Sequence, residues 1–123
     1  MTEYIVLLLG NAERETWWGT VNEQERKDMF AEHDRFGREL AARGHTITGG
    51  AELHSSTEAR TVQPGGTVVT EGPYAETSEM VGGYYVVESD DLDDLVECCK
   101  ILAATGEAVE VRRTVVHAEQ PAS

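Results

Sequence analysis

The chain has 123 residues, close to the usual size of one domain, and 40% of them are hydrophobic, as in soluble globular proteins. Ten Lys and Arg against 23 Asp and Glu give a formal charge of −13, which argues against nucleic-acid partners and anionic membranes. No run approaches the ~18 apolar residues that span a bilayer. We therefore expect a cytoplasmic protein of bacterial type with neither nucleic-acid nor membrane partners.

The first predicted element is a strand at residues 4–9, YIVLLL, whose continuous apolar character is typical of a strand buried on both faces. Its short apolar run has an acidic flank, which does not fit a signal peptide. Residues 11–20, NAERETWWGT, read as a loop that carries Trp17 and Trp18. These two rings are candidate binding residues that line a hydrophobic pocket, although packing at a subunit interface is the favoured alternative.

A helix is predicted from Asn22 to about Arg43. Asn22 can cap the helix, with Glu25 three residues later as in a capping box, and Gly44 is a natural stop. The apolar stripe of this helix has spacings of four, three and four residues and contains one histidine: Met29, His33, Phe36, Leu40. This periodicity predicts an amphipathic helix that packs on a sheet.

Several short strands follow the helix. Residues 45–54 alternate as in a strand, with a bulge or bend expected at Gly49 and Gly50. Residues 58–62 and 66–70 flank the turn sequence QPGG and predict a β-hairpin. A further strand, GGYYVVES, occupies residues 82–89.

A second helix is expected to begin at residues 89–91 and to end at Gly106, with a carboxylate-rich first turn that suits the positive end of the helix dipole. Its expected buried face is Leu92, Leu95, Val96, Cys99 and Leu102. The two cysteines, Cys98 and Cys99, are adjacent, so we expect both to be reduced, one facing the core and the other outward. The last strand is AVEVRRTVV.

The predicted order, β-α-β-(β-β)-β-α-β, is the α+β, ferredoxin-like (split βαβ) plan with an inserted β-hairpin. Residues 1–116 form a single domain, and residues 117–123 form a short polar tail. Two helices cover only one face of such a sheet, yet its strands are apolar on both sides. We therefore expect a homodimer in which a second sheet covers the first.

Three segments resemble a known family. They are H-x-x-F-x-x-x-L-x-x-x-G from His33 to Gly44, GGAEL at 49–53, and TEGPYAETSEMVGGYY at 70–85. Together they resemble the YCII-related family, more narrowly its DGPF-domain branch, over nearly the whole chain. The resemblance implies a ferredoxin-like protomer in a dimeric α/β barrel. It also implies a helix histidine paired with a carboxylate as an active site in parts of the family.

The same resemblance implies genes that often lie beside those of extracytoplasmic-function sigma factors. The chain departs from the DGPF motif, since Glu71 replaces the family's Asp and Tyr74 its Phe, and Ser78 stands where a basic residue is usual. The loss of that basic residue removes a local counter-ion, so the resemblance does not imply a charge pair here.

The candidate catalytic residues are His33, Glu76 and Glu71. His33 is the one histidine on the stripe, where it serves as a general acid or base, or else as a structural histidine bonded to a backbone carbonyl. The carboxylates Glu71, Glu76 and Glu79 share a segment without Lys or Arg, and Glu76 best fits the family pattern. Tyr74 and Glu79 are candidate binding residues. Alternatively, the segment is a solvated turn with a capping glutamate, in which Tyr74 only anchors the loop.

No phosphate loop or dinucleotide fingerprint is present in the sequence, and His45, His54 and His117 are scattered, so we expect no cofactor and no metal. The favoured hypothesis is a small dimeric enzyme with acid/base chemistry on a small organic molecule. The alternatives are a non-catalytic ligand-binding or regulatory dimer, with a sigma-factor partner, and a purely structural dimer.

Overall fold

The computed structural model describes residues 1–74 and 80–117. The elements in chain order are β1 (Thr2–Gly10), α1 (Ala12–Thr20), α2 (Glu23–Ala42), β2 (Thr46–Glu52), the 3-10 turn η1 (Ser56–Glu58), β3 (Arg60–Val62), β4 (Val69–Glu71), β5 (Met80–Ser89), α3 (Leu92–Ala103) and β6 (Ala108–Arg113). No helix among these is long and apolar enough to cross a bilayer.

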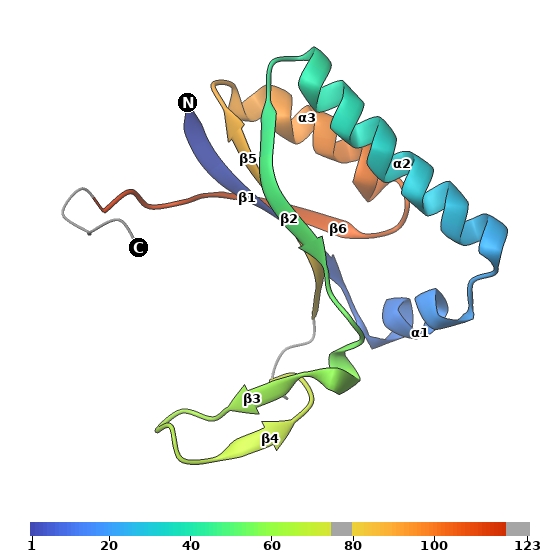
Figure 1. Cartoon of the computed structure of the whole chain (residues 1–123), viewed down its shortest axis with the longest axis vertical. Helices are drawn as coiled ribbons and strands as arrows, with labels where there is room; N and C mark the ends of the chain where they lie inside the picture. The colour runs from blue at the N-terminus through green and yellow to red at the C-terminus, as the bar shows by residue number, and fades with distance from the viewer. Residues whose placement is uncertain (75–79, 118–123) are drawn as a thin grey trace.

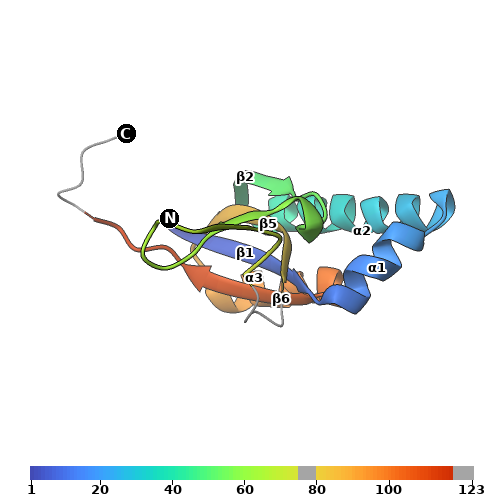
Figure 2. The ribbon, with the colours of Figure 1, turned by 90° about the horizontal axis from the view of Figure 1, so that it is seen from below.

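The main sheet has the strand order β2-β5-β1-β6, and each neighbouring pair is antiparallel. Figure 2 shows the four strands in this order, from β2 at the top to β6 at the bottom. Helices occupy the connections from β1 to β2 and from β5 to β6. This arrangement is consistent with the predicted ferredoxin-like plan. The predicted hairpin is also present, as a separate two-stranded sheet of β3 and β4.

The hydrophobic core lies between the sheet and one layer of helices. Figure 1 shows α2 and α3 side by side on one side of the sheet. Their apolar side chains meet those of β1 and β5, and the side chains with no exposed surface include Val6, Phe36, Leu40, Val87 and Leu95. Phe36 and Leu40 come from the stripe predicted for α2, because positions four apart lie on one face of a helix.

The opposite face of the sheet is apolar at its centre. Along β1 the buried residues Tyr4, Val6 and Leu8 alternate with the partly exposed residues Ile5, Leu7 and Leu9. The register places Ile5 opposite Val86 and Leu7 opposite Tyr84, both of which are also partly exposed. In a single chain, β1 is therefore buried on the helix side only, and its other side is half covered.

Several local predictions are confirmed. Asn22 and Glu25 form the capping box of α2, and Gly44, which follows the helix, has a φ of 85°. The pairing of β2 with β5 shifts register between Ile47 and Gly49, at the expected bulge. Gly50 has a φ of 153°, and a Cβ atom there would lie 2.6 Å from the carbonyl oxygen of Tyr84. Only glycine fits such a backbone.

Three predictions are wrong. Residues 11–20 are not a loop, because Ala12–Thr20 form α1, with the Asn11 side chain accepting a hydrogen bond from the Arg14 backbone N–H at its start. Cys98 is buried like Cys99, because α3 packs against α2 as well as against the sheet. Conversely, Leu92 and Val96 on α3 are 42% and 43% exposed.

Candidate functional site

His33 is hydrogen-bonded to a tyrosine of the sheet. Its Nδ1 atom lies 2.6 Å from the hydroxyl oxygen of Tyr85. Tyr85 points toward the helices because it lies on the same face of β5 as the buried residues Gly83 and Val87, two positions away on either side. Phe36, one helical turn after His33, packs on the Tyr85 ring with the centroids 5.3 Å apart. The contact therefore joins the middle of α2 to the middle of the sheet.

Tyr85 retains its proton over a wide pH range. Burial, and then the nearby carboxylate of Glu107, raise the pKa of its phenol above the ordinary value of 10.0. A protonated phenol can donate to Nδ1 of His33, which leaves the proton of a neutral imidazole on Nε2. Within residues 1–74 and 80–117, Nε2 has no hydrogen-bond partner. Nε2 is therefore the ring nitrogen that the described fold leaves without a partner.

Glu107 supplies a partly buried carboxyl beside this pair. It lies between Gly106 and the first residue of β6, and desolvation by burial raises its pKa above 4.5. The positive charge of Arg14 lowers that pKa, as does His33 when it is protonated, while the carboxylate of Glu52 raises it further. No described residue forms a hydrogen bond or an ion pair with the Glu107 side chain. Burial with a shifted pKa is typical of carboxyl groups in functional sites.

Helix α1 follows directly after β1, at the end of the sheet next to this group. Figure 2 shows α1 leading into the start of α2 at that end. The guanidinium of Arg14 lies 4.1 Å from the ring centroid of Trp17. Nη1 of Arg14 would lie 2.9 Å from a Cβ atom built on Gly106. Arg14 therefore lies against the turn that precedes Glu107, and it brings a positive charge to the site.

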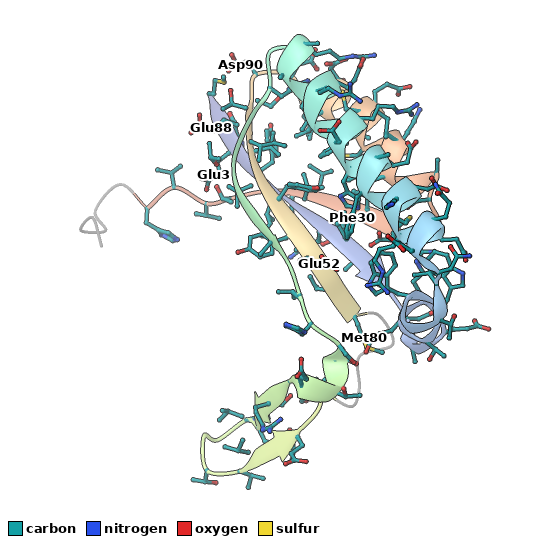
Figure 3. The ribbon with its side chains drawn as sticks, turned by 45° about the vertical axis from the view of Figure 1, so that its right-hand side comes forward. Glu3, Phe30, Glu52, Met80, Glu88 and Asp90 are labelled. Atoms are coloured by element: carbon teal, nitrogen blue, oxygen red, sulfur yellow. The ribbon has the colours of Figure 1, made fainter. Side chains whose placement is uncertain are left out.

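The tryptophans form a small aromatic cluster with α2. The Trp18 ring lies 6.2 Å from the ring of Phe30 in an edge-on arrangement, and 6.3 Å from that of Trp17. Figure 3 shows Phe30 on α2 above α1. Trp17 is 36% exposed and Phe30 51% exposed. The cluster adds an accessible apolar surface close to the polar group of His33, Tyr85 and Glu107.

The sequence model of the YCII-related domain matches residues 4–117. The chain belongs to the YCII-related family. The match runs from β1 to the end of β6 and so includes His33, Tyr85 and Glu107. A search of curated proteins finds no significant match to the chain.

The predicted carboxylates of this YCII-related domain are distributed differently. Glu71 is exposed in β4, opposite Arg60 of β3. Gly72 has a φ of 90°, and its backbone N–H donates to the carbonyl of Ala59, so the residues after Glu71 turn as expected. Tyr74 is 40% exposed. Glu76 and Glu79 lie outside the described residues, and the predicted pairing of His33 with Glu76 stays a prediction.

Sequence reasoning missed Tyr85, Glu107 and Arg14. Tyr85 could have been found, because the alternation along GGYYVV places it on the same face as Val87, beneath the helix stripe that includes His33. Nothing in the sequence marks Glu107 as buried. The composition of residues 11–20 predicts a loop and so does not indicate Arg14, whereas α1 brings it to the site.

Proposed function

We propose that this member of the YCII-related family is a small homodimeric enzyme that uses His33 for acid/base chemistry on a small organic molecule. His33 exchanges a proton with the substrate through Nε2, and Tyr85 holds the ring through Nδ1. Glu107 is the second titrating group of the site. Trp17 and Trp18 contribute apolar surface to which the substrate binds.

The observation that carries this proposal is the contact of 2.6 Å between Nδ1 of His33 and the Tyr85 hydroxyl. A histidine used only to fill the core would have both ring nitrogens satisfied by the fold, as is usual for buried polar groups. Here one nitrogen is fixed and the other has no partner among the described residues. A ring that is held at one nitrogen is oriented for proton transfer at the other.

The raised pKa of Glu107 supports the same proposal. A carboxyl group whose pKa is higher than usual is a better proton donor near neutral pH than an exposed glutamate. It lies close enough to His33 and Tyr85 for their charges to interact. Acid/base sites usually combine two titratable groups with different pKa values, as His33 and Glu107 would do here.

The homodimer part of the proposal rests on the open face of the sheet, defined by the partly exposed residues Ile5, Leu7, Tyr84 and Val86. A second copy would cover this apolar face, and the interface would be self-complementary about a twofold axis. The dimeric α/β barrel implied by the family resemblance has this kind of interface. The acidic net charge would restrict contact between copies to such an apolar surface.

A panel of small esters, lactones and enolisable carbonyl compounds tests the enzymatic proposal, with turnover followed spectroscopically. For any compound that the wild type converts, we expect His33→Ala to lose about 10²- to 10⁴-fold in kcat/KM. His54→Ala is the matched control, because the side chain of that histidine is 92% exposed and lies outside the site. Full turnover by His33→Ala would refute the role of His33.

A regulatory dimer is the alternative, and it predicts a different result. A compound from the panel would then bind without turnover, or a basic partner protein would bind the acidic surface in a salt-dependent way. Binding without conversion of any compound, combined with dimer formation, would favour this alternative over the enzyme.

A further inference from the structure

A second cluster of chemically reactive side chains lies at the other end of β5. Figure 3 labels Glu88 and Asp90, which flank Ser89, at the end of the sheet farthest from Met80. Ser89 and His45 are both buried there. Asp94 and Cys98 project toward them from one face of α3, because residues four apart lie on the same side of a helix. The proposed reaction does not use this cluster.

Three potential metal ligands meet in the cluster. One side-chain donor atom from each of His45, Asp94 and Cys98 lies within 4.8 Å of the other two. Nε2 of His45 is 2.7 Å from Oδ2 of Asp94. His45 and Cys98 are buried, while the Asp94 side chain is 30% exposed, so an ion can enter from solvent past the carboxylate.

Further hydrogen bonds orient two of these ligands. Nδ1 of His45 lies 2.8 Å from the hydroxyl oxygen of Ser89, which also accepts a bond from the Asp91 backbone N–H. Arg43 donates through Nη1 to Oδ1 of Asp94 at 2.8 Å. The atoms left to bind an ion are therefore Nε2 and Oδ2, which are hydrogen-bonded to each other at 2.7 Å in the absence of a metal. Metal-binding histidines and carboxylates are usually fixed in this way through their other polar atom.

The charges of the cluster suit a divalent cation. Arg43 is positive, but it forms ion pairs with both Asp94 and Glu39. Nε of Arg43 lies 2.8 Å from Oε1 of Glu39. With Cys98 as a thiolate, the negative charges of Cys98, Asp94 and Glu39 exceed the positive charge of Arg43. A divalent ion would then bring the cluster close to neutrality. Metal binding by a cysteine requires the thiolate, so it would displace the proton of the Cys98 thiol.

We propose that His45, Asp94 and Cys98 form a binding site for a borderline-soft divalent metal of the zinc class. Nitrogen, oxygen and sulfur ligands together are typical of Zn²⁺ and of its spectroscopic substitute Co²⁺, whereas Mg²⁺ and Ca²⁺ prefer oxygen alone. In a tetrahedral site Nε2 and Oδ2 would separate to about 3.3 Å, which small side-chain rotations achieve. The fourth position is left for water or a ligand.

Titration of the full-length protein with Co²⁺ tests the site, because cobalt bound by a thiolate has a characteristic charge-transfer band and intense tetrahedral d–d bands. We expect one equivalent of Co²⁺ to produce both features, and Zn²⁺ to abolish them by displacement. The matched variants are Cys98→Ser, which should lose the charge-transfer band, and Cys99→Ser, which should keep it. Cys99 is also buried and adjacent, but it is not part of the cluster.

The wild-type spectrum alone can overturn the proposal, even if Cys98→Ser does not fold. Octahedral bands without a charge-transfer band would indicate binding at exposed groups such as His54 and Glu58, which lie 3.2 Å apart without a thiol. A charge-transfer band that survives in Cys98→Ser would equally exclude the cluster. A gain in melting temperature with Zn²⁺ in the wild type and in Cys99→Ser, but not in Cys98→Ser, would support it independently.

Discussion

The hydroxyl oxygen of Tyr85 lies 2.6 Å from Nδ1 of His33, and this contact crosses from the sheet to the helix layer. It fixes the side chain on which the proposed chemistry depends. It also makes a contribution to stability that can be separated from catalysis.

Tyr85→Phe removes the hydroxyl but keeps the ring that packs on Phe36. We expect a loss of about 0.5–1.5 kcal/mol in the free energy of unfolding, measured with urea, because one hydrogen bond is lost. The imidazole of His33 should also change its NMR chemical shifts. Tyr84→Phe is the control, since Tyr84 lies on the open face of the sheet. Equal losses in the two variants would contradict the assignment of the bond.

Glu107→Gln should stabilise the protein at neutral pH. The folded-state pKa of Glu107 is raised above 4.5, mainly by burial, so its protonated form favours folding. That contribution is complete below the ordinary pKa and is lost as pH rises through the folded value, which leaves a destabilising carboxylate at pH 7.

We expect the melting temperature of Glu107→Gln to exceed that of the wild type by about 2–4 °C at pH 7 and by much less at pH 4. Glu110→Gln, which removes a β6 carboxylate bonded to Arg112, should give no gain. A melting-temperature gain of Glu107→Gln over the wild type that grows toward acid pH would contradict the raised pKa of Glu107.

Leu7→Lys should dissociate the proposed homodimer. Leu7 lies at the centre of the open face, opposite Tyr84 on one neighbouring strand and Glu110 on the other. A lysine there would remove apolar contact area and bring a charge into the interface, where pairing with Glu110 does not offset the desolvation of both groups. Sedimentation analysis should show a dimer for the wild type and a monomer for this variant.

Val96→Lys is the control for the dimer test. Val96 is 43% exposed and belongs to α3, on the helix side of the sheet. This variant should remain dimeric. A wild-type monomer would exclude the sheet-face dimer, and dissociation of both variants would place the interface elsewhere.

Gly50→Ala should destabilise the fold at the bend of β2. The backbone φ of 153° and the carbonyl oxygen of Tyr84, 2.6 Å from a Cβ atom at this position, both oppose a side chain. We expect a loss of about 1–3 kcal/mol. Gly37→Ala is the opposite case, because it lies inside α2 with no atom nearer than 4.0 Å and should gain about 0.5–1 kcal/mol.

Elements with strong local patterns could be predicted from the sequence. Helix α2 combines a capping box at Asn22, a regular apolar stripe and Gly44 as a stop, and each of these acts within the segment itself. Helix α1 has no comparable apolar stripe, and its sequence with two adjacent tryptophans therefore predicts a loop although it forms a short helix. Its stability comes from the Asn11 cap and from contacts with the rest of the chain.

In the candidate site, too, some features follow from one segment and others from packing between segments. The position of His33 on its stripe follows from helix periodicity, so its selection required no tertiary knowledge. Its partner Tyr85 depends on how α2 packs over β5, and the burial of Glu107 depends on the turn that joins α3 to β6. The burial of Cys98 does not follow from the sequence for a related reason, because periodicity gives the width of one buried face but not the presence of a second helix.

The chain has two tryptophans, and both belong to α1. Arg14 stacks on Trp17, and the guanidinium of Arg26 lies 5.0 Å from the centre of the Trp18 ring. Intrinsic fluorescence is therefore a built-in optical probe of one neighbourhood, the one around His33 and Glu107. A compound that enters there would change the emission directly, and compounds could be screened for binding without a label or a known reaction.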